Sequence, residues 1–431
     1  MRQKQILAPI AVTLSQTVWT PEHLERALKA RLPRPLSRIA APLARRLIRQ
    51  FPLKVPPDPH LIRQFLAAQP ETRRLIAFGR RHNLRPDPVL EDPQFLPDPS
   101  FAHLDLPQLT TPADLAEWLA ISPEELTRFA DLRGLSARSD DPFGPHYRCH
   151  LHEKTNGDLR LIEEPRPFLK RLHRRILMGI LDQIPAHPAA MGFCKGRSAV
   201  QGAARHAGEA LVISFDLADF FPAIDTARLY GVFRALGYPQ PVARPLSGLV
   251  SAITPPRVLK TPGLAAAHHL ATRHLPQGAP TSPALANAAA YRLDCRLAGL
   301  ARSMDATYTR YADDLTFSGD PHIEGPLQSA IPQIVQEEGF ALNLAKTRAM
   351  PAHRRQSVTG ITVNRKTNLR RSDFDRLKAT IHHLKTKSDP RRNDIRFLTR
   401  LSGQIAWAEA LNPMRGHKLR TSFNAVLDAR G

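Results

Sequence analysis

Apolar residues along the first part of the chain recur at a helical spacing. Within residues 20–52, Leu24 and Leu28 lie four positions apart, and Leu43 and Leu47 repeat that interval. Residues at i and i+4 share one face of a helix, and the positions between them are polar or basic. This stretch is therefore predicted to form basic amphipathic helices.

Two further helix starts are marked by capping residues. Thr111 precedes Pro112 and stands three positions before Asp114, and Ser122 stands in the same relation to Glu125. A hydroxyl at the N-cap can accept a hydrogen bond from the backbone N–H three residues later, and the carboxylate there can accept one from the N-cap N–H. Residues 84–110, rich in Pro, Asp and Gln, are expected to form a linker or extended loop before these helices.

From residue 147 onwards the pattern is one of short strands mixed with helices. Alternating and continuous apolar runs are both present, and turn residues separate them. The expected elements are strands at 147–152 and 160–163 around Asn156-Gly157, a helix over 168–184, a strand over 211–217, a helix over 282–302, a hairpin over 308–318, a helix over 326–338, a β-rich stretch over 356–364, and helices over most of 372–430, the first capped by Ser372, with Trp407 in their core. Because strands and helices do not alternate regularly, the predicted fold class is α+β.

Charge is distributed unevenly over the chain. The 431 residues carry 61 basic and 39 acidic side chains, a net charge of +22. Residues 1–56 account for +9 and residues 351–431 for +12, so the middle of the chain is almost neutral. A basic surface is typical of nucleic-acid binding, whereas solubility alone does not require two separate basic ends.

Composition excludes several other classes of protein. No apolar run approaches the ~18 residues of a membrane span, and the polar start favours the cytoplasm over secretion. The three cysteines are few and widely spaced, which argues against a disulfide framework or a zinc site and favours buried free thiols. We therefore expect a large-cored cytoplasmic protein with no membrane partner.

Three carboxylates follow or interrupt apolar strands. Asp216 ends the run Leu211–Phe215, and Asp313 and Asp314 lie in the middle of the predicted 308–318 hairpin. Carboxylates gathered at one sheet edge repel one another unless cations lie between them, and Mg²⁺ prefers such oxygen ligands. An Asp-Asp pair alone would indicate only a hairpin turn, so the argument depends on the surrounding motifs.

These motifs resemble those of the reverse transcriptases, and in particular the bacterial retron-type enzymes. The blocks that carry the resemblance are, in chain order, Gly192–Ser198, Phe215–Phe221, Leu275–Pro283, Tyr311–Asp314, Gly339–Arg348 and Val358–Asn364. They occur in the family's order across roughly residues 147–370, a span of over half the chain. The resemblance implies a right-hand polymerase of fingers, palm and thumb with a basic helical N-terminal extension: residues 1–110 form the extension and linker, 111–350 the fingers and palm, and 351–431 the primer-grip strands and helical thumb.

The resemblance also implies roles for single residues. Asp216, Asp313 and Asp314 would be catalytic and would bind two Mg²⁺ ions together with the carbonyl of Leu217. The residues expected to contact the incoming deoxynucleotide are Lys154, Arg160, Phe221, Gln277, Gly278 and Lys346, with Phe221 as the steric gate against a ribose and Lys346 near the leaving pyrophosphate. Those expected to contact nucleic acid in the thumb are Arg376, Lys378, Arg391, Arg392 and Arg396.

The implied reaction is RNA-directed DNA synthesis. A dedicated structured non-coding RNA would serve as template and supply the priming hydroxyl, giving a small DNA that stays joined to RNA, in anti-phage defence with an effector protein. Residues 252–273 contain His268-His269 but no Asn-Ala-x-x-His of the retron insertion. Two alternatives therefore stay open: another bacterial defence or group II intron-like reverse transcriptase, and a non-catalytic RNA-binding scaffold.

Overall fold

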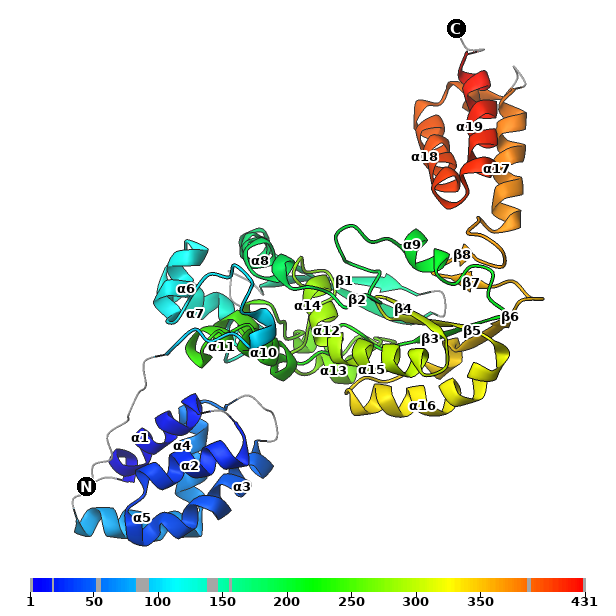
Figure 1. The fold of residues 1–431 in the computed structure, drawn as a ribbon. Coiled ribbons are helices and arrows are strands. Elements are labelled where there is room, and N and C mark those ends of the chain that lie inside the picture. The colour runs from blue at the N-terminus through cyan, green and yellow to red at the C-terminus, as the bar shows by residue number, and fades with distance from the viewer. Residues whose placement is uncertain are drawn as a thin grey trace. The chain divides into compact units, whose positions relative to one another are not determined.

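Helices and short strands alternate irregularly along the chain, which confirms the α+β class. The computed structural model describes residues 3–17, 19–51, 56–82, 93–137, 146–154, 157–385 and 389–428. The chain divides into two compact units: Met1–Ile184 with Ile224–Leu285, and Pro185–Ala223 with Ala286–Gly431. Figure 1 labels the elements of both units.

The first unit begins with a set of helices that has its own hydrophobic core, here called the N-terminal bundle. Its helices are α1 (Gln3–Gln16), α2 (Pro21–Arg31), the 3₁₀ helix η1 (Arg34–Ile39), α3 (Ala40–Gln50), α4 (Pro59–Ala68) and α5 (Pro70–Arg81). Leu24, Leu28, Leu43 and Leu47 are all fully buried in that core, as their spacing predicted. The Thr20 side chain accepts a hydrogen bond from the backbone N–H of His23 and so caps α2.

The rest of the first unit combines helices with one β-hairpin. Its elements are η2 (Pro99–Phe101), α6 (Pro112–Leu119), α7 (Pro123–Ala130), β1 (Tyr147–Glu153), β2 (Leu159–Pro165), α8 (Pro167–Gly179), η3 (Leu181–Gln183), α10 (Thr226–Ala235), α11 (Gln240–Leu249), α12 (Pro256–Leu259) and α13 (Ala267–Leu270). Both predicted capping boxes are present, at Thr111 with Asp114 and at Ser122 with Glu125. β1 and β2 pair antiparallel from Tyr147↔Pro165 to Glu153↔Leu159. Asn156 of the predicted turn lies outside the described residues.

A four-stranded antiparallel sheet, here called the central sheet, organises the second unit (Figure 1). Its strand order is β4 (Thr307–Tyr311), β5 (Asp314–Gly319), β3 (Leu211–Asp216), β6 (Arg348–Pro351). The other elements are α9 (Ala199–Ala204), α14 (Ser282–Ala289, which overlaps the first unit), α15 (Tyr291–Arg302), η4 (Pro321–Ile323), α16 (Glu324–Glu337), η5 (Leu344–Lys346), β7 (Ser357–Val358) and β8 (Ile361–Thr362). Side chains alternate between the faces of each strand. Tyr308 and Arg310 therefore point to α15, whereas Thr309 and Ser318 point to the loop after α9, where His206 bonds to both.

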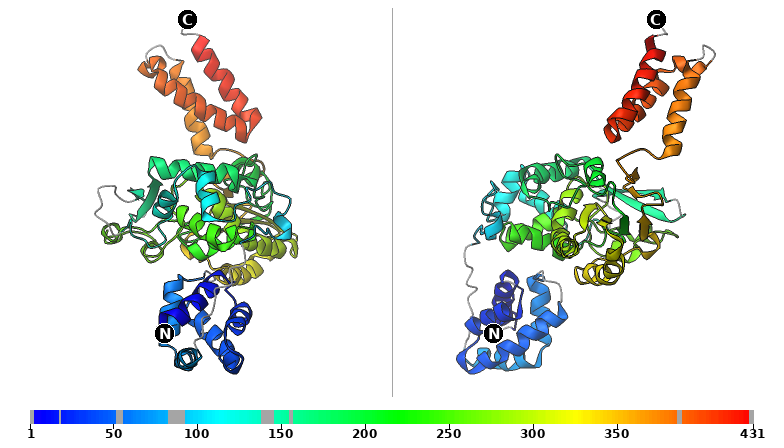
Figure 2. Two further views of the ribbon diagram at one scale, coloured as in Figure 1. Left: turned by 90° about the vertical axis from the view of Figure 1, so that its left-hand side faces the viewer. Right: turned by 45° about the vertical axis from the view of Figure 1, so that its right-hand side comes forward.

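The second unit ends in three helices that lie side by side in both views of Figure 2: α17 (Arg371–Leu384), α18 (Ile395–Leu411) and α19 (Pro413–Asp428), with η6 (Pro390–Asn393) before α18. Leu377, Leu401, Ile405 and Phe423 form part of their shared core. Here Trp407, expected in the core, is 43% exposed.

Three sequence-based expectations are corrected. α17 begins at Arg371, so Ser372 lies inside the first turn and does not cap it. The helix expected over 282–302 is two helices separated at Ala290. The cysteines are free, but Cys149 and Cys194 are half-buried and Cys295 is exposed. None of the helices in the described ranges is long and apolar enough to cross a membrane.

Candidate active site

The three carboxylates predicted to be catalytic lie together at one end of the central sheet. Asp216 is the last residue of β3, and Asp314, the first of β5, is its direct partner in the antiparallel register. Directly opposed residues point to the same face, with Cβ atoms about 5 Å apart. Asp313 occupies the turn before Asp314, and its carbonyl accepts a 2.8 Å hydrogen bond from the Leu217 N–H. Strand pairing thus brings together residues almost a hundred positions apart.

Asp216 and Asp314 have side-chain partners, Lys346 and Ser214 respectively. The Lys346 Nζ donates to both carboxylate oxygens of Asp216, at 3.0 and 3.1 Å. The Ser214 hydroxyl donates to Asp314 at 2.9 Å. Burial raises the pKa of Asp314, the Ser214 hydrogen bond lowers it, and the negative charges of Asp313 and Asp216 raise it, with a net upward shift. The three neighbouring carboxylates form an oxygen-rich donor set that suits a hard divalent cation.

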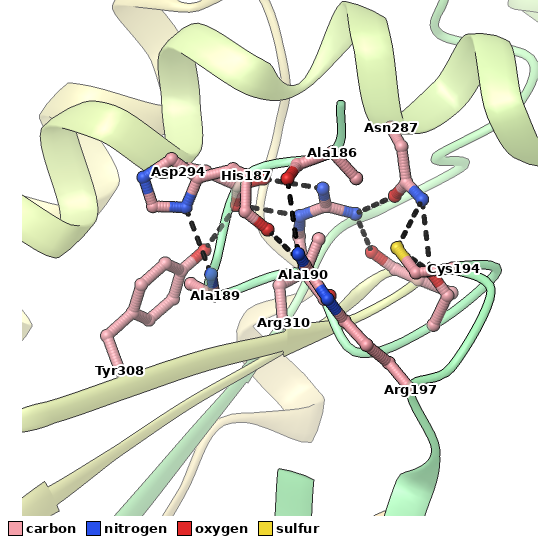
Figure 3. A network of polar contacts seen from close by, with 12 residues as sticks. Ala186, His187, Ala189, Ala190, Cys194, Arg197, Asn287, Asp294, Tyr308 and Arg310 are labelled. Atoms are coloured by element: carbon pink, nitrogen blue, oxygen red, sulfur yellow. Dashed lines mark hydrogen bonds and ion pairs between the residues drawn. The ribbon is translucent and has the colours of Figure 1, made fainter. Parts of the chain in front are cut away.

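A buried arginine supports the hairpin that carries Asp313 and Asp314 (Figure 3). Arg310 has no exposed surface, and its guanidinium donates to both oxygens of Asp294 on α15, at 2.8 and 2.6 Å. It also donates to Asn287 Oδ1 and to the carbonyl of Ala312, each at 3.1 Å. Burial alone would lower the pKa of Arg310, but the Asp294 carboxylate raises it above its usual value. Arg310 therefore remains charged and holds the turn from within the protein.

The turn itself has a left-handed residue and a close neighbour. Ala312 has a φ of 56°, a conformation that side chains rarely adopt. A Cβ on Gly192 would lie 2.9 Å from the Ala312 nitrogen, so only glycine lets this segment approach the turn. Asn287 donates to the Gly192 carbonyl at 3.0 Å, and Arg197 donates to the carbonyls of His187 and Ala190 (Figure 3).

Sequence reasoning did not find this supporting network. Arg310 stands in a predicted strand between Thr309 and Tyr311, and an arginine is almost never fully buried unless it is paired. That signal was present in the sequence, but the partner Asp294 lies on a helix sixteen residues away and could not be identified from spacing.

Phe221 lies in the second unit, in a group of aromatic rings. Its ring centroid is 5.5 Å from that of Phe220 and 6.0 Å from that of Phe193. Phe193 is in turn 6.3 Å from Tyr311, the residue at the start of the catalytic turn. Phe221 is half-buried, whereas Phe220 is buried. The ring of Phe221 therefore retains an exposed part, as a contact with a ligand would require.

Four of the residues expected to contact the nucleotide belong to the first unit. Lys154 ends the β1 side of the hairpin and Arg160 lies exposed on β2. The Gln277 carbonyl accepts a 2.8 Å hydrogen bond from the Glu163 N–H on β2. Gly278 has a φ of 128°, and a Cβ there would lie 2.8 Å from the Ile162 side chain. Gly278 thus allows a close approach to β2, a role that the motif alone did not indicate.

A buried polar group joins the hairpin to the strand-like segment before Gln277. Glu163 and His274 are both almost completely buried, and His274 Nε2 lies 2.7 Å from Glu163 Oε2. The other carboxylate oxygen of Glu163 accepts from Thr254 Oγ1 at 2.8 Å. Each carboxylate oxygen therefore has a partner, which ties three segments of the first unit together.

The five basic residues expected to contact nucleic acid in the C-terminal helices differ in their surroundings. Arg376 is paired with Asp373 at 2.6 Å, and Arg391 with Asp389 at 2.7 Å. Arg392 is only 9% exposed, a position that does not suit the phosphate contact expected of it. Lys378 and Arg396 are exposed, and no ion pair joins either to a carboxylate of the described residues. Trp407, Phe397, Arg376 and Arg400 line a groove of about 750 Å³ on these helices.

Comparison with known proteins identifies the family. Residues 152–363 match the family described as reverse transcriptase (RNA-dependent DNA polymerase). The chain is 38% identical to the Retron Mx65 reverse transcriptase of Myxococcus xanthus, over 81% of this chain and 78% of that one. It is 34% identical to the Retron Mx162 reverse transcriptase of the same species, over 72% and 66% of the two chains. Identity to the Retron Ec86 reverse transcriptase of Escherichia coli is 32%, over 65% and 80%. With this similarity over most of its length, the chain belongs to the retron reverse transcriptases, and its activity is that of an RNA-directed DNA polymerase.

Proposed function

We propose that the protein copies part of a dedicated structured RNA into a small DNA that remains joined to that RNA. The relatives named above are retron enzymes, and the observation that carries the catalytic half of the proposal is the pairing of Asp216 with Asp314 beside Asp313. The same RNA would supply both template and priming hydroxyl. Anti-phage defence with an effector protein, in the cytoplasm, is the biological setting we propose.

The three carboxylates are proposed to bind two Mg²⁺ ions, with the Leu217 carbonyl as a further ligand. The donor set fits, since it consists of carboxylate and carbonyl oxygen atoms, the ligands that Mg²⁺ prefers. Bound there, the ions would lower the pKa of the attacking 3′-hydroxyl. They would also stabilise the negative charge on the pentacoordinate phosphorus of the transition state and on the leaving pyrophosphate. In this proposal Asp216 and Asp313 are the principal ligands, and Asp314 is held by Ser214.

The remaining residues would position the substrate. Lys346, whose ammonium contacts Asp216, would act beside the leaving pyrophosphate, where it could donate a proton. The exposed part of the Phe221 ring would exclude a ribose 2′-hydroxyl and so select deoxynucleotides. Lys154 and Arg160 would bind the triphosphate, while Gln277 and Gly278 would border the nucleotide.

The C-terminal helices are proposed as a thumb that binds the duplex. Lys378 and Arg396, both exposed, are the best candidates for phosphate contacts. Arg376 and Arg391 would contribute less to duplex binding, because the charge of each is partly neutralised by a carboxylate partner. Fingers and palm would then be the portion from residue 111 to 350, and residues 1–110 a separate RNA-binding extension.

Sequencing the nucleic acids that co-purify with the protein tests the proposal. One RNA species should be present, joined to a DNA of discrete length that is complementary to part of that RNA. DNA unrelated to any bound RNA, or of repetitive untemplated sequence, would favour another kind of reverse transcriptase. RNA without any DNA, from cells in which the wild-type protein is expressed, would favour the scaffold alternative.

A further inference from the structure

A basic hollow lies in the first unit, where the β1–β2 hairpin leads into α8. It has a volume of about 270 Å³, and its lining includes Arg148 of β1, Arg166 before α8, and Arg171 and Arg174 of α8. Pro165 and Pro167 flank Arg166, whose backbone N–H donates to the His146 carbonyl at 2.9 Å. The prolines and this hydrogen bond fix the backbone at the junction, so the hollow has a defined shape.

The negative charge in the lining is already compensated. Glu164 is its one acidic residue, and Lys170 Nζ lies 2.6 Å from Glu164 Oε1. His150 Nε2 lies 3.7 Å from the other oxygen. The hydrogen bond and charge of Lys170 lower the pKa of Glu164, which keeps this carboxyl ionised and paired. Arg148 stands opposite Glu164 in the β1–β2 register, and its charge also lowers the pKa of that carboxyl. The other three arginines, Arg166, Arg171 and Arg174, face the hollow with no ion pair to a carboxylate of the described residues.

The guanidinium groups of these arginines remain available to a ligand. Arg148, Arg166, Arg171 and Arg174 are all exposed, and within the described part of the chain no ion pair joins any of them to an acidic side chain. Arg171 stacks over the Phe168 ring at 4.9 Å, which orients the guanidinium but leaves its N–H donors unused. Four like charges around one hollow repel one another, and an anion between them would relieve that repulsion.

We propose that this hollow binds backbone phosphates of the RNA strand. Guanidinium forks match the oxygens of a phosphate group in geometry and charge. The hollow is distinct from the expected triphosphate contacts, because Glu164 stands four residues from Arg160 on β2, about 13 Å along an extended strand. Since the lining is open and its cations come from two elements, it suits a strand that passes over it. This inference rests on the proposed use of RNA as template.

Two arginines of α8 provide a matched pair for the test. Arg171 and Arg175 are both exposed, and each stacks on an aromatic ring, Arg175 over Trp118 at 5.4 Å. They lie one helical turn apart, but only Arg171 lines the hollow. Arg171→Gln and Arg175→Gln therefore each remove one positive charge from the same helix. Only Arg171→Gln removes it from the lining of the hollow.

The full-length variants would be titrated with single-stranded RNA of mixed sequence, with DNA of the same sequence and with inorganic pyrophosphate, at several salt concentrations. Arg171→Gln, and more so Arg171→Gln with Arg174→Gln, should weaken RNA binding and flatten its log–log salt dependence by about 0.7 for each phosphate that the protein no longer neutralises. Arg175→Gln should leave both unchanged. Equal losses of affinity for Arg171→Gln and Arg175→Gln would overturn the proposal, as would a loss confined to DNA or to pyrophosphate.

Primer extension on a saturating RNA template separates this inference from the proposed function. If the wild-type protein extends a primer but Arg171→Gln with Arg174→Gln binds RNA as tightly as wild type, the hollow is not an RNA site. If the wild-type protein makes no DNA on any RNA, the proposed function fails instead, whatever the result of the binding titrations.

Discussion

The N-terminal bundle and the central sheet use charge in opposite ways. Residues 1–82 carry sixteen basic and four acidic side chains. The described arginines of the bundle lie at or near its surface, around a mainly apolar core. The central sheet instead buries the Arg310–Asp294 pair and gathers three carboxylates at one end. Surface charge attracts a polyanion over a distance, whereas buried or clustered charge fixes the positions of individual atoms. Changes in the bundle should therefore alter affinity, and changes in the sheet should alter catalysis and stability.

The largest effect is expected at the carboxylates. Asp313→Asn with Asp314→Asn should reduce DNA synthesis below detection, because the amides cannot hold the divalent ions. RNA binding should be largely intact, since these residues repel rather than attract phosphates. Filter binding and primer extension on the same preparation measure both. A correctly folded variant that loses binding and synthesis equally would break the proposed contrast between sheet and bundle.

Removal of one partner from the buried pair should be the next largest effect. Arg310→Met leaves Asp294 buried and unpaired, which should cost about 3–5 kcal/mol of the free energy of unfolding. Arg310→Met with Asp294→Leu should recover part of that stability. Urea denaturation monitors both, with Arg205→Met as control, because Arg205 is exposed in the same unit. A destabilisation no greater than that of the control would show that the pair does not stabilise the fold.

The choice between ribose and deoxyribose tests the proposed role of Phe221 as a steric gate. Phe221→Val should raise the ratio of kcat/KM for ribonucleotides over deoxynucleotides by about 10- to 200-fold, since one steric contact is worth about 1–3 kcal/mol. Phe193→Leu is the control, because Phe193 is a neighbouring ring with an exposed surface. An unchanged ratio in an active Phe221→Val enzyme would show that Phe221 is not the steric gate.

As the pH falls, the stability of the unit that contains the central sheet should decrease because of a buried histidine. Burial, together with the charge of Arg205, lowers the pKa of His206 from 6.5 to about 3. Between these values the unfolded chain binds a proton that the folded chain does not, so stability should fall as the pH drops, by up to about 1.4 kcal/mol per pH unit. The described histidines of the bundle are exposed. His206→Gln should flatten this part of the stability profile in chemical denaturation, and a profile as steep as that of wild type would assign it to other groups.

The smallest effect is expected from surface charge in the bundle. Arg45→Gln with Arg49→Gln removes two exposed cations of α3 and should weaken RNA binding a few-fold, with a salt slope flatter by about 1.4. Single-nucleotide addition at saturating template should be unchanged. Lys29→Gln is the control, because Lys29 is paired with Glu25 at 2.7 Å. An effect of Lys29→Gln half as large as that of the double variant, in proportion to the charge removed, would mean that the bundle acts only through its total charge.

The sequence by itself determined the local elements and the identity of the chemistry. Leucine spacing predicted the buried face of the bundle, and the Thr111 and Ser122 capping boxes form as expected, because each of these features depends on residues within a few positions. The paired strands 211–216 and 314–319 carry the predicted carboxylates at their adjoining ends. The family motifs also anticipated the similarity to retron reverse transcriptases.

Tertiary structure alone decided which charges are buried and which aromatic side chains are exposed. Arg310 and Arg392 are arginines in chemically ordinary contexts, yet both are buried, and Trp407 has helical core spacing but is exposed. Ala290 interrupts a predicted continuous helix, and Gly278 is required by its approach to β2 rather than by its own motif. In each case the deciding neighbour is distant in sequence or is set by how helices pack. Local propensity contains no information about such a neighbour, because burial is a property of the assembled fold.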